Sequence, residues 1–226
     1  MKTIVILVEP EYEENLGLIA RAMKNFAIYD LILVNPLVDH LTDKARSRAV
    51  HAQDILEKAK IVKTIGEALK DADYSAATSA KTTRSNTMFR NAVSVQQFAK
   101  RFSNSDAKVA IVLGRESSGL NNEEIQQCDL LVHIPTSKEY KTLNVSHAAI
   151  VLFSQIFLAQ KKSKFKTAGK KTRQILLKKF TAMVNARSNL DNKKAVIDSF
   201  KGLINRSLIT EKECCALLSA FFGKPK

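Results

Sequence analysis

Apolar residues follow two different patterns along the first 160 residues of the chain. In one pattern, β-branched and aliphatic residues form short continuous runs, which predict strands covered on both faces, as in a parallel sheet. These runs lie at 3–8, 30–36, 61–65, 74–78, 108–113 and 130–134. In the other pattern, apolar residues recur at helical spacing, at 16–26, 40–58, 66–72, 93–102 and 144–159. The alternation predicts an α/β fold class with a mostly parallel sheet and helices on both faces.

A second unit is predicted at the carboxyl end of the sequence. Residues 161–171 hold six lysines without an apolar period, which is typical of a linker. Three amphipathic helices are predicted beyond it, at 172–186, 191–205 and 211–222, and Thr210 and Glu213 are spaced as a capping box. The sequence therefore predicts a domain at 1–160, a lysine-rich linker at 161–171 and a small all-helical domain at 172–226.

The charge of the chain is concentrated in this second unit. The formal net charge is +14, of which residues 1–160 contribute +1 and residues 161–226 contribute +13. A polyanion such as RNA is the natural partner of this region, because phosphate neutralisation releases counterions. We therefore expect the helical unit to dock RNA rather than to serve only as a solubilising tail.

Other features of the composition exclude several classes of protein. The opening apolar run is too short for a membrane span, so we expect a cytoplasmic protein. The three cysteines and four scattered histidines show neither a disulfide framework nor the spacing of a metal site, so we expect no metal. Neither G-x-G-x-x-G nor a phosphate-binding P-loop occurs, which disfavours dinucleotide enzymes, P-loop ATPases and Rossmann-type methyltransferases.

Polar residues cluster where the predicted strands end, which is where α/β proteins bind ligands. The clusters are Asn15 with Arg21, then 78–84, 114–119 and 135–144. Each of them has a simple structural explanation when taken alone. Asn15 could cap a helix, Arg21 could be a solvated side chain, and the glycines could form turns.

Together, however, these clusters resemble the three motifs of the SPOUT superfamily. The motifs are Asn15-x-Gly17-x-x-x-Arg21, Gly114-Arg115-Glu116-x-x-Gly119-Leu120, and Ile134-Pro135 followed by Leu143-Asn144-Val145-Ser146-x-Ala148. Within that superfamily they look like the 2′-O-ribose RNA methyltransferases of the TrmH class. The Leu-Val-Glu-Pro opening and the later Ile-Pro-Thr-x-x-x-Tyr-x-Thr-Leu-Asn run are most similar to the TrmJ branch, which modifies tRNA at the start of the anticodon loop.

This resemblance implies S-adenosylmethionine as methyl donor, a trefoil knot in the first domain, and a homodimer. It also implies the residues of a cofactor pocket, whose backbone groups would bind the adenosine. These are Thr78, Ser79, Ala80, Leu113, Gly114, Ile134, Thr142, Leu143 and Asn144.

The resemblance further implies a catalytic set of Arg21, Asn15, Glu116, Thr142 and Asn144. Arg21 would lie beside the target ribose, oriented by Asn15 and Glu116, and Thr142 would place a hydroxyl near the methyl donor. A guanidinium stays protonated at a pKa above about 12, so Arg21 is expected to position groups rather than to remove a proton. The expected RNA contacts are Lys81, Arg84, Arg115, Lys161, Lys162, Lys170 and Lys171.

The sequence leaves several functions open. We expect a tRNA ribose methyltransferase that uses S-adenosylmethionine. The alternatives are a 2′-O-methyltransferase of ribosomal RNA and a non-catalytic RNA-binding protein of the same fold. A methyltransferase for peptides or small molecules is disfavoured by the charge of residues 161–226.

Overall fold

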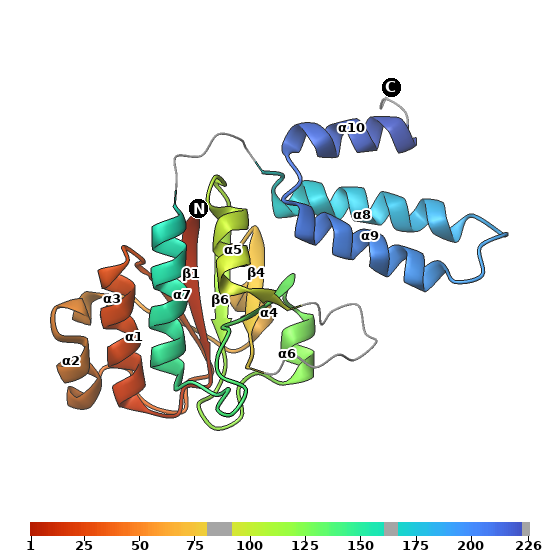
Figure 1. Cartoon of the computed structure of the whole chain (residues 1–226). Coiled ribbons are helices and arrows are strands. Elements are labelled where there is room, and N and C mark those ends of the chain that lie inside the picture. Colours follow the sequence, from red (N-terminus) through yellow and green to blue (C-terminus); the bar gives the residue numbers. More distant parts are fainter. Residues whose placement is uncertain (81–91, 161–166, 223–226) are drawn as a thin grey trace.

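A computed structural model describes residues 1–80, 92–160 and 167–222 of the protein. It consists of an α/β domain built on one sheet and three further helices beyond one end of that sheet (Figure 1). The predicted α/β class is confirmed.

The sheet has seven strands, and every pair of neighbours is parallel. Their spatial order is β3-β2-β1-β6-β4-β7-β5. β3 is shorter than its predicted run, and the two-residue β5 was not predicted. The strands are β1 (Lys2–Val8), β2 (Asp30–Val34), β3 (Lys60–Val62), β4 (Tyr74–Thr78), β5 (Val93–Ser94), β6 (Lys108–Leu113) and β7 (Leu130–His133).

Helices cover both faces of the sheet. The helices of this domain are α1 (Glu13–Asn25), α2 (Asp43–Ala49), α3 (Gln53–Glu57), α4 (Ile65–Ala68), α5 (Val95–Phe102), α6 (Asn122–Gln126) and α7 (Val145–Ala159). The larger core cluster joins one face of the sheet to α1, α2, α3, α5 and α7, and the smaller cluster joins the other face to α4 and α6.

The prediction of one helix over 40–58 is wrong. α2 ends at Ala49, because the next residue, Val50, has a φ of 53°, which cannot continue a right-handed helix. A 3₁₀ turn (Val50–Ala52) and α3 follow.

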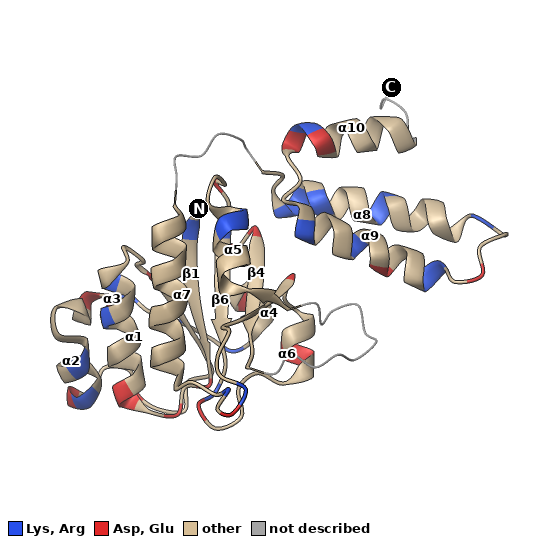
Figure 2. Ribbon diagram, in the orientation of Figure 1, with Lys and Arg blue, Asp and Glu red and all other residues tan. Residues whose placement is uncertain are grey.

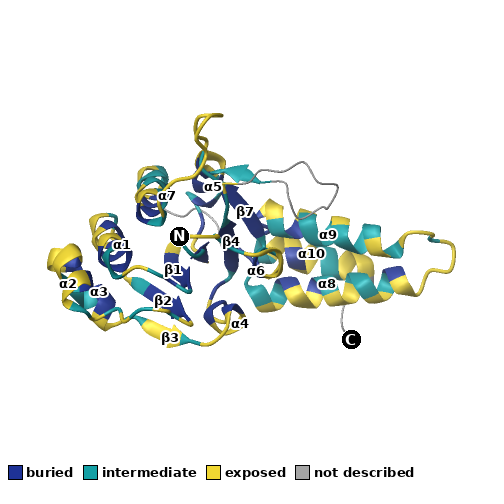
Figure 3. Cartoon of the chain, turned by 90° about the horizontal axis from the view of Figure 1, so that it is seen from below, coloured by how far each residue is buried: buried dark blue, intermediate teal, exposed yellow. Residues whose placement is uncertain are grey.

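The position of β1 inside the sheet explains why its sequence is apolar throughout. Val5 and Leu7 point into the larger core cluster, whereas Ile4, Ile6 and Val8 point into the smaller one. Successive side chains of a strand face opposite sides of the sheet, and both sides are covered here. Figure 3 shows the same arrangement, with the strands buried between two layers of helices.

Residues 167–222 form the helical module, whose helices are α8 (Lys170–Asn185), α9 (Lys193–Ser207) and α10 (Glu211–Phe222). Ala168, Leu176, Ile204, Ile209 and Cys214 form its small core. The predicted capping box is present, since Thr210 Oγ1 accepts a hydrogen bond from Glu213 N and Thr210 N donates one to the Glu213 carboxylate.

The helical module packs against the edge of the sheet where the strands begin. Thr167 donates to the carboxylate of Asp106, Lys170 donates to the carbonyl of Leu69, and Leu208 is buried in the core of the α/β domain. Thr167 also forms an isolated antiparallel β-bridge with Thr210. Residues 167–171 of the predicted linker therefore belong to the module. The module therefore lies at the amino ends of the strands.

Candidate active site

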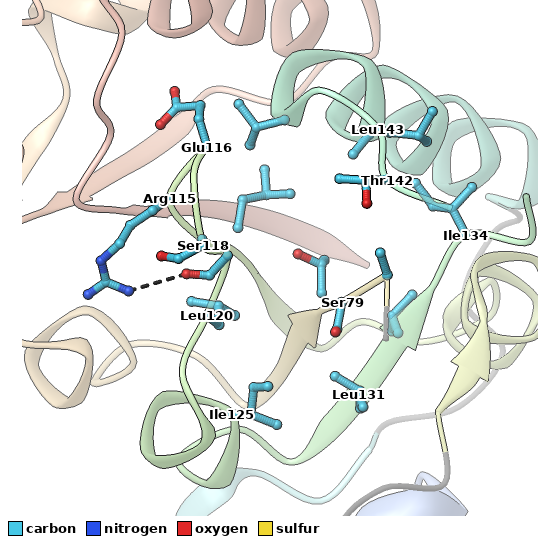
Figure 4. A pocket seen from close by; sticks show the side chains of 18 of the residues that line it. Ser79, Arg115, Glu116, Ser118, Leu120, Ile125, Leu131, Ile134, Thr142 and Leu143 are labelled. Atoms are coloured by element: carbon cyan, nitrogen blue, oxygen red, sulfur yellow. Dashed lines mark hydrogen bonds between the residues drawn. The ribbon is translucent and has the colours of Figure 1, made fainter. Parts of the chain in front are cut away.

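A cavity of about 640 Å³ lies at the carboxyl ends of β4, β6 and β7, which is the opposite edge of the sheet from the helical module. Three loops and the first turns of α7 enclose it (Figure 4). The loops are residues 78–80 after β4, 113–122 after β6 and 141–143 before α7.

The structure brings most of the predicted cofactor residues together in this cavity. Its lining includes Thr78, Ser79, Ala80, Leu113, Gly114, Ile134, Thr142 and Leu143. In Figure 4 the side chains of Ser79 and Thr142 reach toward the centre. Asn144 is outside the lining and instead caps α7, because its side chain accepts hydrogen bonds from Ser146 N at 2.8 Å and Ser146 Oγ at 2.6 Å. Contact of the lining residues with a cofactor stays a prediction.

The loop after β6 folds back tightly on Gly114. A Cβ atom at this position would lie 2.3 Å from the carbonyl carbon of Gly119 and 2.4 Å from Leu120 N. Gly119 has a φ of 72°, and its N–H donates to the carbonyl of Arg115 at 2.9 Å. Both glycines are therefore required by the shape of the loop.

Arg115 stabilises this loop from the side that faces away from the cavity. Its Nε lies 2.6 Å from the carboxylate of Glu9, and its two terminal nitrogens donate to Glu124 at 2.8 and 3.0 Å. Hydrogen bonds to Glu124 and Glu9 raise the pKa of Arg115 further above its ordinary value, and the bond from Arg115 lowers the pKa of Glu9. Its side chain points away from the cavity (Figure 4). Two carboxylates of the same chain occupy its guanidinium, and contact of Arg115 with RNA stays a prediction.

Asn15 and Glu116 meet as the resemblance implied. Asn15 Nδ2 donates to Glu116 Oε1 at 3.0 Å, and Glu11 N donates to Glu116 Oε2 at 2.9 Å. Glu11 in turn accepts hydrogen bonds from the amide and hydroxyl of Ser117, which lower the pKa of Glu11. Asn15 is buried inside α1, so its alternative role as a helix cap is excluded. These bonds tie the loop after β1 to the loop after β6.

Arg21 does not join the pair formed by Asn15 and Glu116. It is exposed on α1. At about 100° per residue, six residues rotate its side chain by about 240° relative to Asn15. Within one chain, the predicted orientation of Arg21 by Asn15 and Glu116 is therefore not supported.

Several lining residues were not named as cofactor contacts in the sequence analysis, although some of them lie in its polar clusters and motifs. They are Ser117, Ser118, Asn121, Asn122, Ile125, Leu131, Val132, Lys141, Val145, Ala148 and Leu152. The sequence does predict the short helix α6, because Asn121 or Asn122 is placed to cap it ahead of Glu123 and Glu124, and the structure shows Asn121 in that position.

The predicted RNA contacts are only partly covered by the structure. Lys81, Arg84, Lys161 and Lys162 lie outside the described residues. Lys170 donates to the carbonyl of Leu69, and Lys171 is exposed on α8. Their contact with RNA stays a prediction.

The cavity suits a nucleoside ligand with a polar tail. Apolar side chains of Leu131, Val132, Ile134 and Leu152 offer a surface for a base, and the loops supply backbone polar groups and hydroxyls. Its volume lies within the usual range of small-molecule sites. S-adenosylmethionine has this chemistry, so the residues present fit it.

The described residues show neither a cluster of metal ligands nor a membrane-spanning helix. No group of three His, Cys, Asp or Glu side chains there is placed to hold a metal ion. None of the described helices is long and apolar enough to span a bilayer.

The family model and the curated relatives identify the protein as a methyltransferase. The chain belongs to the SpoU rRNA methylase family, whose model matches residues 2–154. The resemblance seen in the three sequence motifs is thereby confirmed.

A relative agrees with this assignment, and two solved structures share the fold. A protein of Methanocaldococcus jannaschii, named tRNA (cytidine-2′-O-)-methyltransferase TrmJ, is 37% identical over 224 residues, covering 96% of this chain and 97% of that protein. The crystal structure of TrmJ from Z. mobilis superposes with a TM-score of 0.69 at 22% identity, over 97% of each chain. An S-adenosylmethionine-bound rRNA methyltransferase from Sinorhizobium meliloti gives a TM-score of 0.55 at 18% identity, over 69% of this chain and 55% of that one.

Proposed function

We propose that the protein transfers a methyl group from S-adenosylmethionine to a ribose 2′-hydroxyl of tRNA at the start of the anticodon loop, in the cytoplasm. The observation that carries this proposal is the cavity at the ends of β4, β6 and β7, which is enclosed by the loops that hold the second and third family motifs. The similarity to the Methanocaldococcus jannaschii protein extends over nearly the whole chain, including the helical module, and supports tRNA as substrate.

The cofactor would lie in the cavity against residues 78–80, 113–114, Ile134 and 142–143. When bound, S-adenosylmethionine supplies an electrophilic methyl group on sulfur. The loops that line the cavity would enclose it. The proposed knot would be formed by the strands and loops around the cavity, between β6 and α7.

Arg21 is proposed to act across a homodimer. It shares the exposed side of α1 with Leu18, which is 37% exposed, three residues away. The adjoining helix α7 exposes Ile150, Phe157 and Leu158, with exposed fractions of 42%, 46% and 74%. These apolar side chains form a surface that a second copy would bury. Arg21 would then approach the cavity of the partner, which explains why it lies apart from Asn15 and Glu116 in its own chain.

In this arrangement Arg21 positions the substrate. A ribose hydroxyl is a weak nucleophile, and it must lose its proton as its oxygen attacks the methyl carbon. The guanidinium would hold the hydroxyl and an adjacent phosphate in line with the methyl group. Such alignment can remove roughly 7 to 11 kcal/mol of the barrier.

Transfer of labelled methyl to unmodified tRNA tests the activity. We expect label in tRNA, at a ribose at the start of the anticodon loop, and almost none with Arg21→Ala. Label in ribosomal RNA alone would favour the alternative substrate. Binding of S-adenosylmethionine without transfer to either RNA would favour a non-catalytic RNA-binding protein.

A mixing experiment tests whether Arg21 acts across the dimer. Arg21→Ala keeps an intact cavity, whereas Gly114→Ala keeps Arg21 and loses the cavity. If Arg21 acts in the partner, mixed subunits regain about one quarter of the wild-type rate, because half of random dimers are heterodimers with one complete site. Mixtures as inactive as their parents would contradict this arrangement.

A further inference from the structure

Two glutamates of the loop after β1 hold the loop after β6 at two points. Glu9 binds Arg115, and Glu11 binds Ser117. Figure 2 shows acidic residues in red where α1 begins, next to this contact. The two glutamates differ in what they hold. The Arg115 side chain points away from the cavity, whereas Glu116 and Ser117 belong to its lining.

Glu11 contacts this lining through both its side chain and its backbone. Its carboxylate accepts a hydrogen bond from Ser117 N at 2.8 Å and another from Ser117 Oγ at 2.7 Å. Its own N–H donates to Glu116 Oε2 at 2.9 Å. Hydrogen bonds to a carboxylate are stronger than those between neutral groups. One residue therefore holds two successive residues of the lining.

Both oxygens of the Glu116 carboxylate are fixed by these contacts. Oε1 accepts a hydrogen bond from Asn15 Nδ2 at 3.0 Å, and Oε2 accepts the one from Glu11 N. Asn15 is 7% exposed within α1, and its amide group is oriented by the bond to Glu116. A displacement of residues 116 and 117 would therefore change the orientation of Asn15, which belongs to the first family motif.

The tight turn of the loop after β6 is held independently of Glu11. Gly119 N donates to the carbonyl of Arg115 at 2.9 Å, and Arg115 is bound by Glu9 and Glu124. These contacts remain when the Glu11 side chain is removed, so the wall of the cavity should persist. Glu11 is thus placed to affect the orientation of groups at the site more than the cavity itself.

We propose that Glu11 is a positioning residue for methyl transfer, which acts through Ser117 and Glu116 to hold Asn15 in the orientation that the reaction requires. This inference rests on the proposed function, because it takes transfer to a ribose hydroxyl as the reaction. Glu11 lies outside the lining of the cavity, so it acts without touching the cofactor. Displacement of a positioned group by about 1 Å can lower a rate by about 100-fold, so such indirect control is sufficient.

Steady-state kinetics of tRNA methylation by the full-length protein test this role. Glu11→Ala should lower kcat about tenfold, because both hydrogen bonds from Ser117 are lost. The affinity for S-adenosylmethionine, measured by calorimetry, should stay within about twofold of wild type, because the wall of the cavity persists. The matched control is Glu13→Ala. Glu13 lies two residues further on and pairs with Lys44 at 3.5 Å, so its kcat should match that of wild type.

A conservative substitution tests whether hydrogen bonding is responsible. Glu11→Gln keeps an oxygen that can accept from Ser117 N, but it loses the charge that strengthens the bond. Its kcat should lie between those of wild type and Glu11→Ala, about threefold below wild type. Equal losses in Glu11→Gln and Glu11→Ala would overturn a role that depends on hydrogen bonds.

A double variant tests whether Glu11 acts through Ser117. Ser117→Ala should lower kcat in the wild-type background, because the bond from Ser117 Oγ is lost. It should add nothing in the Glu11→Ala background, where that bond is already absent. Additive losses in the double variant would show that the two residues act separately and would overturn the proposal.

Two further measurements separate positioning from a structural role. Hydrogen exchange at Ser117 N should be slow in wild type and in Glu13→Ala, and fast in Glu11→Ala, because its acceptor is removed. Fast exchange in wild type would contradict the contact itself. A marked fall in melting temperature of Glu11→Ala, together with weaker binding of S-adenosylmethionine, would show that Glu11 only supports the fold.

Failure of this inference is distinguishable from failure of the proposed function. Methyl transfer by wild type that Glu11→Ala leaves unchanged would defeat only the positioning role. Absence of transfer by wild type to both tRNA and ribosomal RNA would defeat the proposed function, and this inference with it.

Discussion

Gly114 and Arg115 are adjacent, yet they shape the cavity in different ways. Gly114 allows the loop after β6 to close on itself, because no Cβ fits beside Gly119 and Leu120. Arg115 holds the closed loop to Glu9 and Glu124, which belong to the loop after β1 and to α6. The lining of the cavity thus depends on one residue without a side chain and on one side chain directed away from it.

Replacing Gly114 by alanine should strongly weaken cofactor binding. The added methyl group would meet backbone atoms 2.3 to 2.7 Å away, which cannot move without opening the loop. We expect affinity for S-adenosylmethionine to fall by more than about tenfold, or 1.4 kcal/mol, in calorimetry. Gly66→Ala is the matched control, because its new methyl group would meet nothing closer than 3.9 Å. Equal affinities for the two variants would contradict this account of the loop.

The ion pair between Glu9 and Arg115 should make stability depend on pH. The pKa of Glu9 is lowered in the folded state, so the pair stabilises the protein above the unfolded pKa, which is about 4.3. That contribution is lost as the pH falls through the lower, folded pKa. Glu9→Gln should therefore lower the free energy of unfolding by about 1 kcal/mol at pH 7, and the difference should disappear in acid.

Thermal or urea unfolding at several pH values measures this difference. Glu57→Gln serves as control, because Glu57 pairs with Arg46 on the surface, with exposed side-chain fractions of 49% and 36%. Surface pairs contribute little, so its effect should be smaller at every pH. A Glu9→Gln effect that persists unchanged in acid would show that the carboxylate charge is not responsible.

At the residue level, the sequence predicted which loops form the site better than it predicted the contacts within them. The motif spacing correctly brought Asn15 and Glu116 together. It could not show that Arg115 is bound internally, because a motif records residue types and not the carboxylates that fold against them. Nor could it separate Arg21 from Asn15, since that separation follows from the rotation of α1.

The position of α1 depends on close contact with α2. A Cβ at Gly17 would lie 2.2 Å from the carbonyl oxygen of Ala45 and 2.7 Å from Arg48 Cβ. Glycine here brings the two helix backbones together and holds α1, which carries Asn15 on its buried side, against the sheet. The same glycine belongs to the first family motif, so the motif includes a packing residue.

Replacing Gly17 by alanine should destabilise the α/β domain. The helices would have to separate, and overpacking of this kind costs about 1 to 3 kcal/mol. Differential scanning calorimetry should show a lower melting temperature. Gly169→Ala is the control, since its methyl group would meet nothing closer than 3.8 Å. An unchanged melting temperature for Gly17→Ala would show that α2 adjusts without strain.

At the level of elements, the hydrophobic pattern predicted the long strands and most of the helices. It failed at Val50, where a single left-handed residue divides the predicted helix, and at the two-residue β5, which is too short to show a period. The hydrophobic pattern could not predict the order of the strands in the sheet. Neighbours such as β1 and β6 are far apart in the sequence, and only long crossover connections decide which strands become adjacent.

Across the whole molecule, Arg173 joins the helical module to the α/β domain. Arg173→Met should destabilise the protein by about 2 kcal/mol, because the contact with Tyr74 and the hydrogen bonds to Asp73 and Asn205 are lost. Faster proteolytic cleavage between the domains would report release of the module. Gln174→Met, at an exposed neighbouring position, is the control. Equal cleavage rates for the two variants would contradict this role.

The sequence predicted a separate basic module but not its attachment. A lysine-rich segment was interpreted as a linker, whereas residues 167–171 pack against the α/β domain or within the module. The contacts depend on single side chains, such as Arg173 and Leu208, that have no periodic signature. Docking of one domain on another is therefore visible only in three dimensions.

Strand β4 sets a minimum length for any one molecule that contacts both the helical module and the cavity. Its first residue, Tyr74, lies beneath Arg173 of the module, and its last, Thr78, lines the cavity. At about 3.3 Å per residue these two residues are about 13 Å apart, at opposite edges of one sheet. A single molecule that contacted both the module and the lining of the cavity would have to extend over at least this distance.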